Sequence, residues 1–480
     1  MDSQRTAFGT AGITYEPIDR VIASALTTAD RRFGHGILLA LFFFAVLLPI
    51  NFGVGSIRMN PSRLYLLLCA IPFGFRLFTG RAGGVTWVDG CMVGFVTLVV
   101  ATLLYHHGTA ELAYALSQVV EMFGGYMAGR ILIRSLADYR RYIRFFLLAL
   151  LVMLPFAIDE MLHHRMLLTD ILSKAFAVVW HNGQSRFGLS RVQVVFPHAI
   201  LYGLFCSLAL ASAFVCYQKQ PFRWLAYLAL VMGMTLMSLS SAPMLSILMQ
   251  FALITWGKIT RGSWKLLAGM VGVIFLLLQL FTHRGAFVIF IETMTLDPAT
   301  GWYRIFIWDW GWHNVVYNPF LGIGLNDWVR PDWMYSSSVD NFWLLMAMRY
   351  GLPAVATILT AFLLHITFIL RARNLSPEAQ TVRTGYVITL VGLIFILTTV
   401  DIWDAVQVFV MFFLGAGAFF YTADQSDAAA PTIPVVDQRS GQRFSRFPQT
   451  VGITRRRDYA ESGEYVRPAF VSPHERTPQK

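Results

Sequence analysis

Residues 265–282 read KLLAGMVGVIFLLLQLFT, and residues 301–314, a short way beyond them, read GWYRIFIWDWGWHN. The first stretch is an apolar run of about the length that a helix needs to cross a lipid bilayer, roughly 20 residues. The second lies in Thr282–Asn341, the longest segment between apolar runs, which holds six of the chain's 13 tryptophans. Segments of this length in compact proteins are usually functional or disordered, and disordered segments are poor in aromatic residues. We therefore expect membrane-crossing helices and one long functional loop.

The composition supports a membrane protein along the whole central part of the chain. Of 480 residues 56% are hydrophobic and only 14% are charged, against about 25% charged in soluble domains. A spanning β-barrel is excluded, because its strands would alternate apolar and polar residues. We predict an all-α polytopic membrane protein with about 12 transmembrane helices, over residues 36–55, 63–80, 86–105, 110–133, 142–160, 196–217, 222–239, 242–257, 265–282, 352–371, 383–401 and 403–421.

Basic residues on alternate loops set the expected orientation and the division of the chain. Lys and Arg gather in the loops that would then face the cytoplasm, with both termini, in a bacterial inner membrane. The segments 161–195 and 283–340 would face the periplasm. We expect a cytoplasmic arm over 1–35, a transmembrane domain over 36–421 containing the periplasmic loop 282–341, and a disordered basic tail over 422–480. The arginines of the tail predict that it is held near anionic lipid by charge. We expect no nucleic-acid partner, because no nucleic-acid-binding fold accompanies these arginines.

Arginines on the predicted periplasmic side are the strongest sign of an anionic ligand. Arg186, Arg191 and Arg284 stand near span ends, and Arg304 lies inside the aromatic run. Cationic residues at such places commonly anchor a helix at the interface. The positive-inside rule does not account for arginines on this side, however, and forked guanidinium groups suit a diphosphate. Both readings stay open from the residues alone.

The aromatic run predicts a surface for sugars. Trp and Tyr collect at bilayer interfaces, which accounts for one or two rings at a loop's ends. The cluster at Trp308, Trp310 and Trp312 alternates rings with polar groups, and flat rings beside polar groups suit the apolar faces and hydroxyls of sugars. Trp302 and His313 are included in the same expected surface. Candidate bases are His283, His313 and Asp340.

Other polar and sulfur-containing residues favour packing roles. Cys69, Cys91, Cys206 and Cys216 lie in or beside apolar spans without metal-ligand spacing, so no metal site and no cofactor are expected. Ionisable and amide residues also occur within the predicted spans. We expect them to pair with arginines inside the bundle rather than to take part in catalysis. They are Glu111, Gln118, Glu121, Asp401, Asp404 and Gln407.

Several motifs together resemble the O-antigen ligase and O-antigen polymerase superfamily of bacterial inner-membrane glycosyltransferases. They are Ser185-Arg186-Phe187-Gly188 with Arg191 and Pro197-His198, then Gly301-Trp302-Tyr303-Arg304 with Trp308, then Asn318-Pro319-Phe320-Leu321-Gly322-Ile323-Gly324, and finally Asp340-Asn341-Phe342-Trp343 with Arg349-Tyr350-Gly351-Leu352. The Pro-Phe-Leu-Gly-Ile-Gly stretch is the most specific. With the spans, the resemblance covers roughly residues 36–421.

The resemblance implies a GT-C-like, metal-independent, inverting glycosyltransferase without a cofactor. It implies transfer of a glycan from undecaprenyl diphosphate to an acceptor hydroxyl, in contact with membrane lipid and alongside a polysaccharide co-polymerase and a flippase. Carried over to this chain, Arg186 and Arg191 would bind substrate, and Arg304 would serve the reaction, with Arg284 added by its location. Asp340 would be the base, with Asn341 beside it.

Two departures from the family pattern bear on the function. The family's His-Asn pair stands here as Asp340-Asn341, and an ordinary Asp has a pKa near 3.9. The family's Ser-Arg before the eighth span reads Ser240-Ser241 here. Both departures favour a polysaccharide polymerase over a ligase that joins glycan to lipid A-core. A glycan or anion transporter is the alternative from another class, although the chain lacks the internal repeats typical of transporters. A structural assembly protein is the third.

Overall fold

The computed structural model describes residues 34–54, 57–80, 82–178, 183–282, 288–289, 298–373 and 375–422. The predicted N-terminal arm, apart from its last two residues, and nearly all of the basic tail lie outside these ranges. By its contacts the chain divides into Met1–Gln425 and Ser426–Lys480, and all described residues belong to the first unit.

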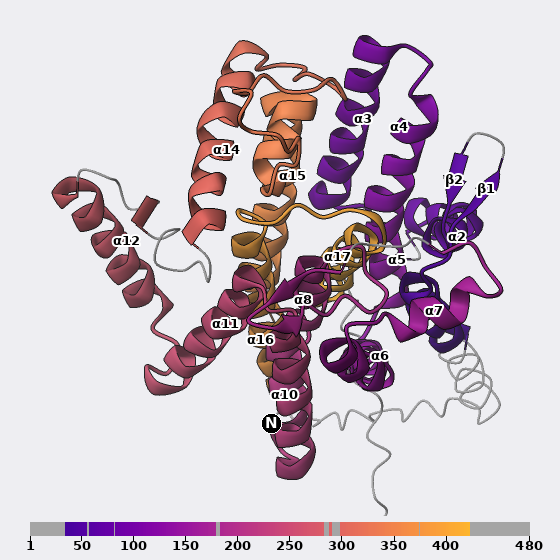
Figure 1. Cartoon of the computed structure of the whole chain (residues 1–480). Coiled ribbons are helices and arrows are strands. Elements are labelled where there is room, and N and C mark those ends of the chain that lie inside the picture. Colours follow the sequence, from indigo (N-terminus) through magenta and orange to yellow (C-terminus); the bar gives the residue numbers. More distant parts are fainter. Residues whose placement is uncertain are drawn as a thin grey trace, which may run out of the picture. The chain divides into compact units, whose positions relative to one another are not determined.

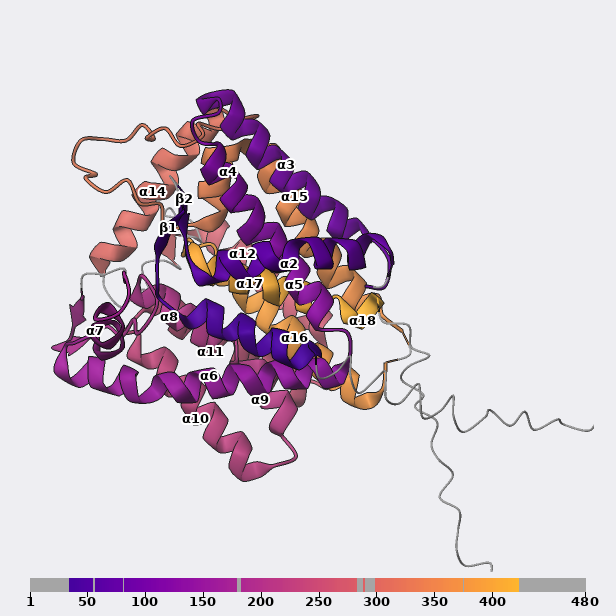
Figure 2. The same cartoon turned by 90° about the vertical axis from the view of Figure 1, so that its right-hand side faces the viewer.

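Helices make up almost all regular structure in the described ranges (Figures 1 and 2). A first helix covers Gly34–Leu47. The others are α2 (Pro61–Phe78), α3 (Trp87–His107), α4 (Leu112–Val119), α5 (Gly125–Leu132), α6 (Leu136–His163), α7 (Leu167–Ser173), α8 (Ala199–Ser207), α9 (Leu210–Tyr217), α10 (Pro221–Met237), α11 (Ser241–Ile259), α12 (Trp264–Phe281), α14 (Pro298–Tyr317), α15 (Phe342–Arg371), α16 (Pro377–Ile396), α17 (Asp404–Ala416) and α18 (Phe419–Thr422), with a π-helical segment η1 (Val120–Gly124).

Two small antiparallel hairpins complete the regular structure of the described residues. Strand β1 (Phe52–Val54) pairs with β2 (Ile57–Met59). Strand β3 (Ser185–Arg186) pairs with β4 (Leu189–Ser190). The first hairpin corrects the predicted span 36–55, because the helix ends at Leu47 and the apolar run continues as a strand.

Eight helices in the described ranges are long and apolar enough to cross a membrane. They are Trp87–His107, Leu136–His163, Ala199–Tyr217, Ser241–Ile259, Trp264–Phe281, Phe342–Arg371, Pro377–Ile396 and Asp404–Thr422. The other four predicted spans fall on shorter helices, on α2 with its two arginines, or on the interrupted run α4–η1–α5. The all-α polytopic membrane fold is confirmed, whereas the count of twelve stays a prediction.

Small residues let two helices of the central bundle touch through their backbones. A side-chain carbon on Gly129 of α5 would collide with the carbonyl oxygen of Phe412, and one on Gly415 of α17 would collide with that of Tyr126. Close backbone approach at small residues is how helices associate where apolar burial does not distinguish protein from lipid. Helices α5 and α17 therefore form the inner contact of the bundle.

Buried polar groups on four elements pair beside this contact. Arg63 of α2 donates from Nε to Oε1 of Glu121 at 2.6 Å, and Glu121 is 1% exposed. Gln407 of α17 donates to Gln118 at 2.9 Å. Glu121 lies in η1, a deviation that often marks special sites within helices. The prediction that intramembrane acids pair with arginine is confirmed for Glu121.

A break in α15 and the Asn-Pro-Phe-Leu-Gly-Ile-Gly motif fit one another. Gly351 has φ 83 and ψ 168 inside the helix, a conformation that side chains with Cβ rarely adopt. The motif runs along the break, where Ile323 N donates to Met348 O at 2.7 Å and Leu352 N donates to Pro319 O at 2.7 Å. The helix that begins at Phe342 therefore continues through the break at Gly351 into the rest of α15.

Two further features concern the helices around the long segment. The segment 282–341 is not irregular throughout, because Pro298–Tyr317 forms α14, which lies beside α15 (Figure 1). Helix α12 extends away from its neighbours in the same view, and none of its residues is buried. The aromatic run therefore stands on a rigid helix.

Candidate functional site

A tight hairpin positions two of the predicted arginines. Between β3 and β4 the chain turns at Phe187 (φ 56) and Gly188 (φ 76). Left-handed backbone at both turn residues matches the twist of a two-residue hairpin. Arg186 ends the first strand, and Arg191 directly follows the second. In this register Arg186 and Arg191 lie on the same face of the hairpin, because Arg186 pairs with Leu189, two residues before Arg191.

The turn after α10 holds both guanidinium groups. Arg186 donates from Nη1 to Leu239 O at 2.9 Å. Arg191 donates from Nη2 to Ser240 Oγ at 2.7 Å and from Nε to Ser238 O at 3.5 Å. Ser240, the first residue of the Ser240-Ser241 pair that stands in place of the family's Ser-Arg, thus accepts a hydrogen bond from an arginine of the hairpin.

A buried carboxylate fixes the backbone just after Arg191. Glu160 of α6 accepts from Gln193 N at 2.9 Å and from Val194 N at 2.8 Å. Val194 has φ 52, a conformation that is strained for a β-branched residue. Glu160 is 3% exposed, so its two hydrogen bonds compensate both the burial of the acid and the strain.

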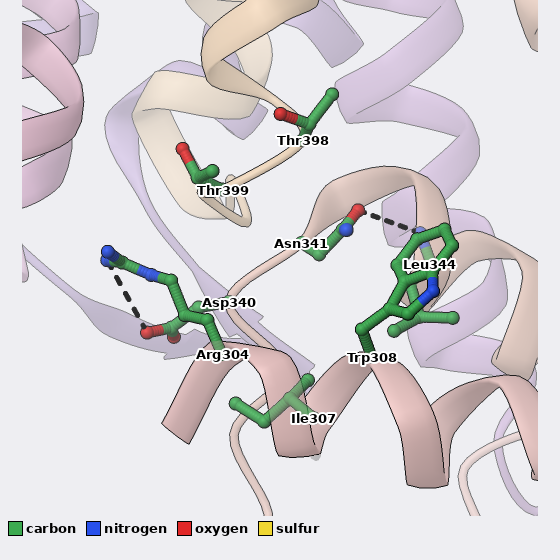
Figure 3. A pocket seen from close by; sticks show the side chains of 8 residues that line it. All are labelled: Arg304, Ile307, Trp308, Asp340, Asn341, Leu344, Thr398 and Thr399. Carbon is green, nitrogen blue, oxygen red and sulfur yellow. Dashed lines mark hydrogen bonds and ion pairs between the residues drawn. The ribbon is translucent and has the colours of Figure 1, made fainter. Parts of the chain in front are cut away.

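Arg304 and Asp340 face one another in a small pocket between α14 and the start of α15 (Figure 3). Arg304 Nη2 lies 4.0 Å from Asp340 Oδ2, and the Arg304 side chain is 10% exposed. Its Nε is buried and has no hydrogen-bond partner in the structure. A buried donor without a partner is costly, so the guanidinium is poised to donate to a ligand.

The remaining walls of this pocket come from three elements. Trp308 and Ile307 belong to α14, Asn341 and Leu344 to the start of α15, and Thr398 and Thr399 to the connection after α16. Asn341 Oδ1 accepts from Leu344 N at 3.0 Å, which caps α15. The helix N-terminus and the Arg304 guanidinium therefore border the same pocket, and both favour negative charge there.

The three described arginines act on one another electrostatically. Burial and, to a smaller extent, the nearby cations Arg186 and Arg304 together lower the pKa of Arg191 to about 10, while Asp340 opposes them. Burial also lowers the pKa of Arg304, with Asp340 opposing and Arg186 adding to the effect. One carboxylate thus stands against three cations. This excess of positive charge would be relieved by an anion such as a diphosphate.

A second carboxyl lies near Asp340. Asp401 is in the connection between α16 and α17, outside both helices, and its Oδ1 is buried without a hydrogen-bond partner. Burial raises the pKa of Asp401 to about 7, with Arg349 opposing this and Asp340 adding to it. A carboxyl with such a pKa can exchange a proton near neutral pH.

The predicted aromatic residues divide between two faces of α14. Trp308 and Trp312 stack with ring centroids 6.1 Å apart and planes 9° apart, and Trp308 lines the pocket. At about 100° per residue along a helix, Trp302, Trp310 and His313 turn away from Arg304. None of these three lines the pocket with Arg304.

The other predicted groups have the following places. Arg284 and His283 lie outside the described residues. In the described ranges, no group of three or more His, Cys, Asp or Glu side chains is arranged to hold a metal ion. The structure brings together Arg186, Arg191, Arg304, Asp340 and Asn341, and their roles stay predictions.

Sequence reasoning missed three supporting residues. The sequence marks Ser240 only as part of the Ser240-Ser241 pair that departs from the family's Ser-Arg, does not single out Glu160, and predicts pairing within the bundle for Asp401. A glutamate near the end of an apolar span is a signal for Glu160, because such an acid is costly unless it has partners. Nothing local in the sequence marks Ser240 as an acceptor for Arg191.

Comparison with known proteins gives one family match, and the matched segment overlaps part of this site. Residues 225–359 match the family model described as O-Antigen ligase. No curated protein matches the chain. The matched segment contains Arg304, Asp340 and the motif at the break of α15, and it ends within α15. Over residues 225–359 the chain is therefore similar to the O-antigen ligase family, which supports the resemblance to the superfamily of O-antigen ligases and O-antigen polymerases.

Proposed function

We propose that this protein is a polysaccharide polymerase that joins repeat units carried on undecaprenyl diphosphate, at the periplasmic face of a bacterial inner membrane. The observation that carries the proposal is the convergence of Arg186, Arg191 and Arg304 beside Asp340. Arg304 Nε is buried there without a partner. A diphosphate on a lipid supplies the anion that this cluster lacks.

The arginines would act on the leaving group. In an inverting transfer, an acceptor hydroxyl oxygen forms a bond to the anomeric carbon while the bond from that carbon to the diphosphate oxygen breaks. Negative charge grows on the diphosphate as this bond breaks, and preorganised cations stabilise growing charge most effectively. Diphosphate leaves readily when its charge is neutralised, so the proposed reaction is metal-independent.

Asp340 would receive the proton of the acceptor hydroxyl. Its Oδ2 lies 4.0 Å from Arg304 Nη2, so the carboxylate stands next to the guanidinium that would bind the leaving group. Its Oδ1 accepts a hydrogen bond from Ser338 Oγ at 3.0 Å, which orients the carboxylate. Asn341 would hold the adjacent end of α15 in place, and with it the position of Asp340.

The stacked rings of Trp308 and Trp312 would guide the acceptor glycan. They are 37% and 45% exposed and form a flat apolar surface that starts at the pocket wall. Sugar rings pack their apolar faces on such surfaces while their hydroxyls stay solvated. Holding the acceptor in line supplies the entropic part of catalysis.

A ligase that transfers the glycan to lipid A-core or another acceptor is the second candidate. It is favoured by the description of the matching family, O-Antigen ligase, and it would use the same donor and the same arginines. In either case, a flippase that delivers the lipid-linked units, and for the polymerase a co-polymerase that sets chain length, would be functional partners.

The size distribution of surface and lipid-linked glycans in a strain without the gene separates the candidates. A polymerase predicts loss of long chains while single repeat units are still transferred or accumulate on the lipid. A ligase predicts long chains stranded on undecaprenyl diphosphate. An unchanged distribution in both pools would contradict both functions.

A further inference from the structure

The pocket lined by Arg304 and Asn341 has room for little more than one oxygen atom. Its volume is about 10 Å³, and a site needs roughly 10–15 Å³ to hold one water molecule. A sugar ring or a whole phosphate group is too large for this space. Whatever enters it from a substrate is therefore a single small group, such as one phosphate oxygen or one hydroxyl.

Arg304 offers this pocket one hydrogen-bond donor. The Arg304 side chain is 10% exposed, and its Nε is buried without a hydrogen-bond partner. Asp340 lines the same pocket, but its carboxylate approaches Arg304 at Nη2, and its Oδ1 already accepts from Ser338 Oγ. The Nε donor is therefore left for a ligand, and a guanidinium nitrogen can only donate.

Asn341 offers a second donor on the wall of the pocket. Its amide accepts a hydrogen bond from Leu344 N at 3.0 Å, and only the amide oxygen can accept (Figure 3). This bond fixes Oδ1 toward α15 and leaves Nδ2 on the other side of the planar amide. Asn341 is 6% exposed, and within the described ranges no acceptor is found for Nδ2. An amide donor at this depth favours a ligand that accepts hydrogen bonds.

The two donors together favour an oxygen that carries negative charge. Arg304 is a cation, and the start of α15, which Asn341 caps, adds the positive end of a helix dipole. Hydrogen bonds to a charged oxygen are roughly twice as strong as those to a neutral one. A phosphate oxygen therefore gains more from this pocket than a hydroxyl does.

We propose that this pocket is an oxyanion hole for one non-bridging oxygen of the donor diphosphate, with Arg304 Nε and Asn341 Nδ2 as its hydrogen-bond donors. The inference rests on the proposed function, because it assigns one atom of the undecaprenyl diphosphate donor to the pocket. Asn341 then contacts the leaving group directly, in addition to capping α15. As the bond to the sugar breaks, both donors would stabilise the charge that grows on this oxygen.

Binding of radiolabelled undecaprenyl diphosphate to the purified full-length protein in detergent tests this proposal. Asn, Asp and Ser cap helices about equally well, so Asn341→Ser and Asn341→Asp keep the cap of α15 but lose the Nδ2 donor. Asn341→Ser should weaken binding about tenfold, because a hydrogen bond to a charged oxygen is lost. Asn341→Asp should weaken binding about 100-fold or more, because a carboxylate repels the phosphate. A role as a helix cap alone predicts wild-type binding from both variants.

Asn60 supplies the matched control, because it caps α2 in the same way and accepts from Arg63 N at 2.8 Å. Asn60→Ser and Asn60→Asp should bind the donor like the wild type. Melting temperatures of all four variants show whether each one folds, and the serine variant of Asn341 decides the test if the aspartate variant does not fold.

The outcomes separate this inference from the proposed function. Wild-type affinity of Asn341→Ser would overturn the inference alone, because the pocket would then hold only water. Failure of the wild type itself to bind the donor would overturn the proposed function and the inference with it. Displacement of the label by phosphatidylglycerol as readily as by unlabelled donor would also overturn the inference, because the pocket would then take the phosphate of any lipid.

Discussion

Arg304 has the least satisfied hydrogen-bonding capacity of the three described arginines at the site. Its Nε is buried without a partner, and its Nη2 approaches Asp340 only to 4.0 Å. Arg191, in contrast, is held by Ser238 and Ser240. This difference in hydrogen bonding predicts that Arg191 is held in place and contributes positive charge to the cluster, whereas Arg304 makes the closest contact with the reacting groups.

Changing Arg304 to Lys should lower polymer formation about 100-fold or more, because a lysine keeps the charge but loses the forked donors. Polymer length and yield on gels of extracted glycans measure the effect. Arg330→Lys is the matched control on the same segment, since Arg330 pairs with Asp327 at 2.6 Å rather than with the pocket. A wild-type yield of polymer from the Arg304→Lys variant would contradict a role for the forked guanidinium donors of Arg304.

Asp401 predicts a dependence of stability on pH. Burial raises its pKa from 3.8 to about 7 in the folded protein. A folded-state pKa above the unfolded value means that stability present below about pH 4 is lost as the pH rises through about 7. Asp401→Asn removes this loss. The variant should therefore gain roughly 1–3 kcal/mol of unfolding free energy over the wild type between about pH 5 and pH 8.

Thermal unfolding in detergent at a series of pH values checks the Asp401 prediction. Asp332→Asn serves as the control, because Asp332 is exposed in the same part of the chain as the site. Parallel curves for wild type and Asp401→Asn across the whole pH series would show that the carboxyl is not buried in the folded protein.

At the scale of elements, the site depends on a short hairpin tied to α6. Glu160→Ala leaves the buried N–H groups of Gln193 and Val194 without an acceptor, at a cost of roughly 1–3 kcal/mol each. Both melting temperature and donor binding should fall, since the hairpin with Arg186 and Arg191 follows this backbone. The neighbouring Asp159→Asn is the control, because Asp159 pairs with Arg165 and His163. If Glu160→Ala lowered neither the melting temperature nor donor binding, the hydrogen bonds to Glu160 would not be what holds the hairpin in place.

The break in α15 makes a second prediction at this scale. A side-chain carbon on Gly351 would collide with Phe320 O. Gly351→Ala should therefore destabilise the protein by more than the roughly 1–2 kcal/mol that left-handed backbone alone costs. Gly84 has φ +73 but open space around it, so Gly84→Ala isolates the backbone cost. Similar melting temperatures for the two variants would contradict the close fit of the motif to the break.

For the whole molecule, apolar runs of spanning length predict most of the bundle, because each helix in a membrane must satisfy its own backbone. The same reasoning fails where an apolar run changes structure, as it does beyond Leu47, where the chain enters β1. The aromatic run was read as a loop because of its glycines and tryptophans, yet Pro298–Tyr317 is helical. Packing of Gly311 against Leu344 of α15 favours the helix there.

The candidate site was predicted in part by the same sequence. Positions for Arg186, Arg191, Arg304 and Asp340 came from motif order and from the side of the membrane on which they fall. The acceptors that hold Arg191 and the backbone after it could not be predicted, because Ser240 reaches the hairpin from the turn after α10 and Glu160 from α6 through tertiary contacts. Asp401 likewise joins the site only when the chain folds.

Direct binding of the donor tests the central claim of a diphosphate site most simply. Purified wild-type protein in detergent should bind radiolabelled undecaprenyl diphosphate, and Arg191→Gln with Arg304→Gln should weaken this binding about 100-fold. Arg223→Gln with Arg330→Gln, which removes two arginines from outside the cluster, should bind like the wild type. Equal affinity of the Arg191/Arg304 variant and the wild type would contradict the account, because the cluster would then not be where the diphosphate binds.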